Sequence, residues 1–218
     1  MKKYFLILFI ALIFSFIKIT NTVFAHNEIK EHWAKEELSI YLAEGYINTY
    51  TDGSIKPDNA ITRYEFSQMI NKIFGYYKKA KINYTDIPID SDMYENLLIT
   101  KEADYISKYD IDGSFRPNKL ISREEAGVVL AKILKLQKID KLENQFSDDY
   151  KISFYAKPYI NSLILKGYMN GYSDNSFRPK SKLTRAEAVV LLDNIVGDIV
   201  KKQLNNKIIN RKLHNTTK

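Results

Sequence analysis

The segment DGSIKPDNAITRYEF at residues 52–66 returns as DGSFRPNKLISREEA at 112–126 and as DNSFRPKSKLTRAEA at 174–188. The copies follow one another at intervals of 60 and 62 residues. Repetition of a segment along a chain is typical of folds that stack one supersecondary unit several times. We therefore expect three versions of one module, each with one candidate binding site.

The second half of each module has the spacing of an amphipathic helix. Apolar residues recur at positions i, i+3, i+4, i+7 and i+8, which places them on one helix face. They are Phe66, Met69, Ile70, Ile73 and Phe74, then Ala126, Val129, Leu130, Ile133 and Leu134, then Ala188, Leu191, Leu192, Ile195 and Val196. Three such stripes predict one shared helical core.

Each of these helices is expected to begin at a capping box. In this motif a hydroxyl accepts a hydrogen bond from the N3 amide, and the N3 glutamate accepts one from the N-cap amide. The pairs are Thr62 with Glu65, Ser122 with Glu125, and Thr184 with Glu187. Because capping accounts for these glutamates, we do not interpret them as catalytic acids.

The first half of each module indicates a further helix, most clearly over 33–44 and 158–166. Gly45 and Gly167 follow these stretches, where a left-handed residue commonly ends a helix, and Asp104 takes that position in the second module. The sequence thus predicts an all-α chain in which helix, ordered loop and helix occur three times.

The N-terminus has the layout of a secretory signal peptide at 1–25. Lys2 and Lys3 precede an apolar run at 4–17, and Ala25 ends a polar stretch at the expected cleavage site. The alternative is a retained membrane anchor, but the run is shorter than the about 20 residues that a spanning helix needs. The rest divides into repeats at 26–78, 79–137 and 138–197 and a basic tail at 198–218, which we expect to fray.

Charge and composition argue against several classes of function. The formal charge of +7 comes mainly from the two ends, because residues 26–197 carry a net charge of only −1. Such a body is poorly suited to binding nucleic acid through its phosphates. The chain has no cysteine and three scattered histidines, so the sequence predicts neither a metal site nor a cofactor.

An arginine directly follows each capping residue, at Arg63, Arg123 and Arg185. A cation at the positive end of a helix dipole costs up to about 1 kcal/mol, so its recurrence calls for a compensating partner. One interpretation is an anion bound by the guanidinium and the free helix amides. The other is a structural ion pair with an acid of a neighbouring repeat.

Four further residues are candidates for ligand contact. Lys56, Arg116 and Arg178 lie in the three loops, where they either bind a ligand or cover the base of a helix with their stems. Trp33 is the only tryptophan. It either fills the core or offers a flat face to a sugar ring.

The repeated motifs resemble those of the S-layer homology domain family. The resemblance rests on His32-Trp33-Ala34, on Gly167-Tyr168, on 112–117 and on Thr184-Arg185-Ala186-Glu187, and three copies cover nearly all of 27–197. It implies a pseudo-threefold helical bundle with grooves between repeats. The implied ligand is the pyruvylated secondary cell-wall polysaccharide of Gram-positive bacteria, whose pyruvate ketals carry carboxylates that suit Arg63, Arg123 and Arg185.

We therefore expect a secreted, non-catalytic protein of the cell wall or surface layer that binds this polysaccharide and, after signal cleavage, no membrane. One alternative is surface-layer assembly through contacts with other surface proteins. A wall-active hydrolase is a second alternative, but it needs two carboxylates across a cleft, and no such pair stands out.

Overall fold

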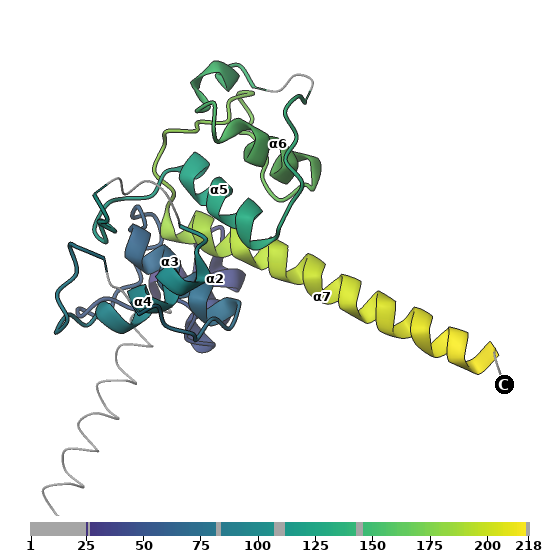
Figure 1. Ribbon diagram of the computed structural model, residues 1–218, viewed down its shortest axis with the longest axis horizontal. Helices are drawn as coiled ribbons and strands as arrows, with labels where there is room; N and C mark the ends of the chain where they lie inside the picture. Colours follow the sequence, from purple (N-terminus) through teal and green to yellow (C-terminus); the bar gives the residue numbers. More distant parts are fainter. Residues whose placement is uncertain (1–24, 26, 82–83, 107–111, 143–145, 217–218) are drawn as a thin grey trace, which may run out of the picture.

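The computed structural model describes residues 25, 27–81, 84–106, 112–142 and 146–216 (Figure 1). The predicted signal peptide, except Ala25, lies outside the described residues. The helices are α2 (Lys35–Ala43), α3 (Arg63–Ile73), α4 (Tyr94–Ala103), α5 (Arg123–Ile133), α6 (Lys157–Leu165) and α7 (Arg185–Thr216), with a 3-10 turn η1 at Asp149–Lys151. Since these ranges contain no strand, the prediction of an all-α fold is confirmed.

The helices pack between repeats in a closed cycle. The second helix of one repeat contacts the first helix of the next: α3 packs against α4, α5 against α6, and α7 against α2. Figure 1 shows α5 and α6 side by side, with the start of α7 running past α2 and α3. The third repeat therefore returns to the first, and each of these three pairs joins two different repeats.

A ring of backbone hydrogen bonds joins the repeats just before α3, α5 and α7. The amide of Ile61 donates to the Leu183 carbonyl, Leu183 donates to Ile121, and Ile121 donates to Ile61, at 2.9, 3.0 and 3.1 Å. All three side chains are buried in the common core. Because each residue gives one bond and receives one, the ring closes only when all three repeats are present.

The predicted helix ends are present in the structure. The capping boxes of α3 and α5 are complete, and at α7 the amides of Thr184 and Glu187 make the same two bonds. Gly45, Asp104 and Gly167 have positive φ values of 69°, 51° and 73°, as the sequence indicated for these positions. Local signals thus fix where α3, α5 and α7 begin and where α2, α4 and α6 end.

The C-terminal tail differs from its expectation. Instead of ending near residue 197, α7 continues to Thr216 and extends well beyond the other elements (Figure 1). Asp198 accepts a hydrogen bond from the Tyr168 hydroxyl and pairs with Lys202 one turn further on, at 2.6 Å. The Tyr168 bond ties the helix to the loop before it at the point where fraying was expected, and the ion pair supports the next helical turn.

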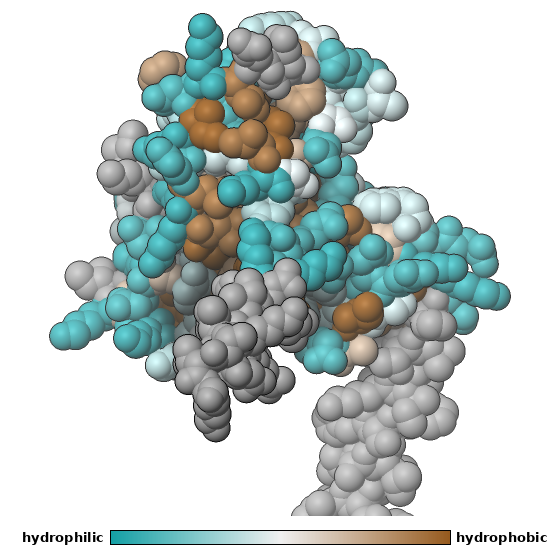
Figure 2. Space-filling model, turned by 90° about the vertical axis from the view of Figure 1, so that its right-hand side faces the viewer, coloured by the Kyte–Doolittle hydropathy of each residue, from teal (hydrophilic) through white to brown (hydrophobic). Residues whose placement is uncertain are grey.

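The surface is mixed. Figure 2 shows one face on which apolar areas are separated by hydrophilic side chains. Exposed aromatic residues include Trp33, Tyr150 and Phe154, with 63%, 79% and 95% of their surface accessible to solvent. Among the described residues, none of the helices is both long enough and apolar enough to cross a membrane.

Candidate functional site

The three arginines at equivalent positions of the repeats lie inside the molecule and join the repeats. Arg63, Arg123 and Arg185 are all buried. Each Nε donates to a backbone carbonyl in the loop of another repeat, at Phe115, Phe177 and Ile55 respectively, over 2.8 to 3.0 Å. These bonds form a second cycle around the bundle and dock the repeats against one another. The ion pair with an acid of a neighbouring repeat, predicted from the sequence, is present at Arg185, which pairs with Glu65 at 2.5 Å.

The helix amides that follow the caps are also occupied. At α3, the amides of Arg63 and Tyr64 donate to the carbonyls of Lys119 and Pro117, and the Glu65 amide donates to Thr62. The equivalent amides of α5 and α7 are bonded in the same way. The sequence interpretation that free amides at these helix starts bind an anion is therefore wrong, because the loop carbonyls of a neighbouring repeat already hold them.

Three acidic residues that the sequence analysis did not single out hold the loops. Glu28, Asp86 and Asp148 each accept bonds from two consecutive loop amides, those of residues 55 and 56, 115 and 116, and 177 and 178. The second residue of each pair has a positive φ between 46° and 58°, which turns both amides toward one carboxylate. The signal for two of them is Tyr84-x-Asp86 and Phe146-x-Asp148, again 62 residues apart.

The loop cations that were predicted to contact ligand pair within their own loops. Lys56, Arg116 and Arg178 form exposed ion pairs with the acids four residues earlier, Asp52, Asp112 and Asp174. None of the three is among the residues that line the two grooves described next. Their contribution to ligand binding stays a prediction.

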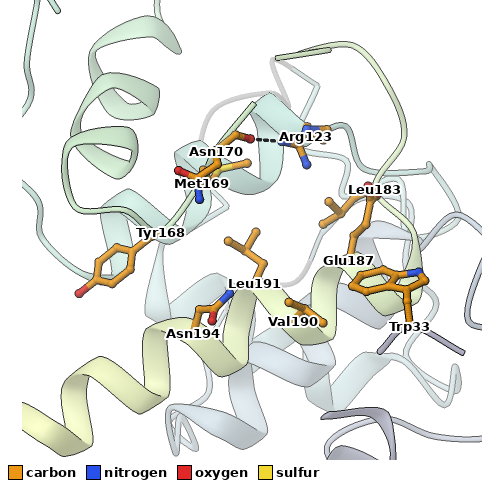
Figure 3. A pocket seen from close by; sticks show the side chains of 10 residues that line it. All are labelled: Trp33, Arg123, Tyr168, Met169, Asn170, Leu183, Glu187, Val190, Leu191 and Asn194. Atoms are coloured by element: carbon orange, nitrogen blue, oxygen red, sulfur yellow. Dashed lines mark hydrogen bonds between the residues drawn. The ribbon is translucent and has the colours of Figure 1, made fainter. Parts of the chain in front are cut away.

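A first groove, the Trp33 groove, lies where all three repeats meet and has a volume of about 180 Å³. Figure 3 shows Trp33 at one end and Tyr168 at the other, Arg123 and Asn170 along one side, and side chains of α7 along the opposite side. Its lining is Trp33, Arg123, Tyr168, Met169, Asn170, Leu183, Glu187, Val190, Leu191 and Asn194. Because Trp33 is largely exposed here, the alternative that it fills the core is wrong.

The geometry of His32 fixes the position of Trp33. The Ala34 amide donates to Nδ1 of His32 at 3.1 Å, so the ring carries its proton on Nε2, which faces Asp58 at 3.2 Å. The indole lies against this imidazole, with the ring centres 5.3 Å apart. Held in this way before α2, the indole leaves one face open toward the groove.

A second groove, the Tyr46 groove, repeats this plan in the first module and has a volume of about 210 Å³. Its lining is Tyr46, Ile47, Asn48, Thr49, Tyr50, Tyr64, Glu65, Gln68, Met69 and Arg185. Tyr46, Asn48, Glu65, Gln68 and Met69 stand 122 positions before Tyr168, Asn170, Glu187, Val190 and Leu191. The two grooves are therefore equivalent sites of the repeat. The second module supplies Arg123 to the groove of the third, and the third supplies Arg185 to the groove of the first.

A tyrosine hydroxyl bonds the capping glutamate at both sites. Tyr50 donates to Glu65 at 2.9 Å, and Tyr172 donates to Glu187 at 2.8 Å. Burial raises the pKa of both tyrosines, so the phenols stay protonated and keep donating. The rings also face a guanidinium, Arg185 over Tyr50 at 4.6 Å and Arg123 over Tyr172 at 4.8 Å. Both glutamates are therefore held by a tyrosine, and of the two tyrosines Tyr50 lines a groove directly.

The stretch of the second repeat that corresponds to 46–52 and 168–174 is 105–112, of which 107–111 lie outside the described part of the chain. In the second repeat an acid, Glu124, follows the arginine of the helix start, where the first and third repeats have Tyr64 and Ala186. Glu124 is buried and accepts bonds from the amide of Ser153 at 3.0 Å and from Lys180 at 2.5 Å. It therefore compensates the charge of Lys180 and fixes the chain before α6.

Comparison with known proteins agrees with this architecture. The sequence profile described as "S-layer homology domain" matches residues 29–67, 83–126 and 145–189. Each matched segment ends in the first turn or soon after the start of α3, α5 or α7. The three matches therefore coincide with the three modules.

Several curated proteins are similar over most of this chain. An exoglucanase, XynX, of Acetivibrio thermocellus is 32% identical over 174 residues, 76% of this chain and 16% of that protein. The cellulosome-anchoring protein of the same organism is 31% identical over 68% of this chain and 34% of its own length. The surface-layer 125 kDa protein of Lysinibacillus sphaericus is 23% identical over 77% and 14%. The chain thus spans about a third or less of these relatives.

Proposed function

Because this chain belongs to the S-layer homology domain family, we propose that it anchors non-covalently to the bacterial cell surface by binding cell-wall polysaccharide in the grooves between its repeats. The supporting observation is the pair of equivalent grooves, each of which brings a guanidinium, a tyrosine, an amide carbonyl and a glutamate to one solvent-open site. Such a mixture of aromatic faces and fixed polar groups suits a sugar better than it suits an extended apolar ligand.

The ligand that we propose in detail is the pyruvylated secondary polysaccharide attached to Gram-positive peptidoglycan. A pyruvate ketal adds a carboxylate to a sugar, and a guanidinium is the side chain that best matches a planar carboxylate. The named relatives include an anchoring protein and a surface-layer protein, and both names favour a location at the cell wall or surface layer. Secretion through the predicted signal peptide belongs to this proposal.

We also propose that the chain itself is not an enzyme. An exoglucanase is among its relatives, but the chain spans only 16% of that protein. The carboxylates of both grooves are engaged in capping: Glu65 and Glu187 accept the amides of Thr62 and Thr184 at 2.9 Å. A capped, tyrosine-bonded carboxylate is poorly placed to transfer a proton or attack a glycoside.

The test is co-sedimentation of residues 26–218 with purified Gram-positive wall sacculi, before and after acid extraction of the secondary polysaccharide. Reversing the charge of Arg63 or Arg185 is a poor probe, since both are buried between repeats and their loss would disturb folding. Trp33→Ala is the better variant, and Phe154→Ala is its control, because both residues are exposed and only Trp33 lines a groove.

We expect binding that disappears on extraction, falls in Trp33→Ala and survives in Phe154→Ala. Binding that persists after extraction, or that falls only in Phe154→Ala, would instead support assembly with other surface proteins. Release of soluble sugar or peptide from the sacculi would show a hydrolase and contradict the proposal.

A further inference from the structure

Phe154 is almost fully exposed, although the chain around it is firmly held. The neighbouring Ser153 donates from its amide and from its hydroxyl to the buried carboxylate of Glu124, at 3.0 and 2.8 Å. Ile152 and Ala156, two residues to either side of Phe154, are buried. The phenyl ring is therefore presented to solvent by a fixed loop directly before α6.

The other two repeats use the position of Phe154 to support the start of a helix. It lies two residues before the N-cap of α6, and its counterparts before α2 and α4 are His32 and Ser91. His32 accepts a hydrogen bond from the Ala34 amide at 3.1 Å, and Ser91 accepts one from the Met93 amide at 3.2 Å. A phenylalanine has no acceptor for such a bond, so the third repeat has an exposed ring where the others have a helix contact.

Phe154 is not an isolated apolar side chain. Tyr150 and Tyr155, on the same short stretch, are also exposed. Exposed aromatic side chains that occur together are typical of surfaces that contact another protein. The loop before α6 is therefore a candidate interaction surface.

The segments that contain the first helices of repeats three and one have opposite charges. Residues 150–166, the repeat-three face, stand 122 positions after residues 28–44, the repeat-one face. The repeat-three face has three lysines and no acid, a net charge of +3, whereas the repeat-one face has five glutamates and two lysines, a net charge of −3. Asp149 offsets Lys157, which leaves Lys151 and Lys166 exposed on the repeat-three face. The two faces are therefore electrostatically complementary.

The repeat-one face also has an apolar hollow with a volume of about 520 Å³. The hollow is lined by Ile29, Lys30, Lys35, Glu36, Ser39 and Ile40. Ile40 is more than half exposed, so this apolar lining faces solvent. Figure 1 shows α2 and α6 well apart in the bundle. Phe154 can therefore enter this hollow only on another copy of the chain.

We propose that copies of this chain associate head to tail, with Phe154 of one copy in the hollow beside Ile40 of the next. Lys151 and Lys166 then face the glutamates of the repeat-one face. Such a contact joins two different surfaces, so each added copy leaves one free ring and one free hollow, and association continues into a chain. This inference goes beyond the proposed function, because neither Phe154 nor Ile40 is among the residues that line the Trp33 groove or the Tyr46 groove.

The contact is weak by its size. One loop in one hollow buries less than the about 1,200 Å² that a stable interface needs. Dilute protein is therefore mainly monomeric, and copies associate where they are crowded, as on a shared surface. A test has to capture brief contacts, which covalent cross-linking does.

The chain has no cysteine, so engineered thiols report the contact without background. Ser39→Cys places a thiol in the hollow, and Tyr150→Cys places one near Phe154 on the exposed loop. Residues 26–218 with one substitution are mixed with isotope-labelled copies that have the other, and disulfide-linked pairs are identified by mass. We expect mixed pairs to form about tenfold faster than pairs of either variant alone, and more slowly as salt is added.

Two further substitutions assign the contact. Phe154→Ser in the Tyr150→Cys copy, or Ile40→Gln in the Ser39→Cys copy, should slow the mixed pairs about tenfold, because each removes apolar burial. Ile89→Ser is the matched control, since Ile89 is also largely exposed but lies before α4, outside both faces. It should leave the rate unchanged, and circular dichroism checks that every variant is folded.

Equal rates for mixed and like pairs, or no effect of Phe154→Ser, would overturn the head-to-tail contact. An excess of like pairs of Tyr150→Cys would instead indicate a two-fold contact between repeat-three faces. An effect of Phe154→Ser without one of Ile40→Gln would place the ring in a different hollow. Sedimentation with wall sacculi is measured separately on Phe154→Ser, so a failure of association is distinguishable from a failure of anchoring.

Discussion

Single residues in this protein hold separate repeats together, and the arginines show this most clearly. A cation at the start of a helix is unfavourable by itself. Arg185 offsets that cost by three bonds to the first repeat, to Ile55, Asn48 and Glu65, while lying 3% exposed. Arg185, which the sequence suggested as a ligand contact, therefore also links the first and third repeats.

We predict that Arg185→Gln lowers the free energy of unfolding by about 3 to 5 kcal/mol, because it disrupts three bonds of a buried guanidinium to another repeat and leaves the partly buried Glu65 without its cation. For a chain of this size, each kcal/mol corresponds to a shift in Tm of about 2–4 °C. Arg185→Lys keeps the charge but loses the fork of donors, so a smaller loss is expected. Thermal unfolding followed by circular dichroism measures both losses. A loss under about 1 kcal/mol for Arg185→Gln would contradict the claim that this residue holds the first and third repeats together.

The loop aspartates provide a prediction about pH. The Ser114 side chain and amide donate to Asp112, and Arg116 lies nearby, so the pKa of this carboxyl falls to about 2. Asp174 has the same arrangement with Ser176 and Arg178, and its pKa is also about 2. Because the folded-state pKa lies below the ordinary value of 3.8, these loops favour the fold above about pH 4, and the contribution is lost as the pH falls toward 2.

Titration by NMR tests this directly in the folded protein. Ser114→Ala should move the pKa of Asp112 up toward its ordinary value, whereas Asp174 in the same sample should stay near 2. If both carboxyls titrate normally in the unsubstituted protein, the turn hydrogen bonds do not hold them in solution.

At the scale of whole helices, two glycines have opposite surroundings. Gly127 lies in α5, and a Cβ added there would collide with the side chain of Ile160 on α6 and approach the Met169 sulfur within 3.1 Å. Gly197 lies inside α7, and a Cβ there would meet nothing within 4 Å. The first glycine permits a close helix pair, while the second only weakens a helix.

We therefore predict effects of opposite sign for the same substitution. Gly197→Ala should raise the free energy of unfolding by about 0.5–1 kcal/mol, since alanine loses less conformational entropy in a helix. Gly127→Ala should lower it by about 1–3 kcal/mol through overpacking. Urea unfolding with unchanged m-values compares the two. Stabilisation by Gly127→Ala would mean that α5 and α6 are not closely packed.

Helices were well predicted from the sequence, but their partners were not. The periodic stripes and the Thr62, Ser122 and Thr184 caps are local signals, so they locate α3, α5 and the start of α7. Which helix a stripe faces depends on contacts between distant residues, such as the ring through Ile61 and Leu183. The closed cycle of helix pairs therefore became visible only in the structure.

The same limit applies to the candidate site. Trp33, Arg123 and Arg185 were named from the sequence and do line grooves. The loop cations Lys56, Arg116 and Arg178 were named on charge alone, which does not reveal that each pairs with an acid four residues earlier. The polar residues Asn170 and Asn194 were missed, because an asparagine in a loop or helix carries no distinguishing pattern.

For the whole molecule, the main consequence of the cycle is that no repeat is complete without the other two. Repeat one supplies α2 for α7, receives Arg185 from repeat three, and gives Trp33 to the groove of repeat three. Open solenoids gain stability repeat by repeat, because each unit contacts only its neighbours in sequence. A closed ring of three has no free end, so its repeats are expected to unfold together.

We predict that a fragment of residues 26–137, which holds two repeats, does not fold. It would leave the apolar face of α2 without α7 and the Ile61 amide without the Leu183 carbonyl. The full 26–218 chain should unfold in a single transition, with helix content and Trp33 emission changing together. Adding the fragment 138–218 to 26–137 should restore helix content at high concentration, because it supplies α6, α7 and the missing third of the ring. A stable, cooperatively unfolding 26–137 fragment would instead show that adjacent repeats suffice and that the closing contacts between repeats one and three are dispensable.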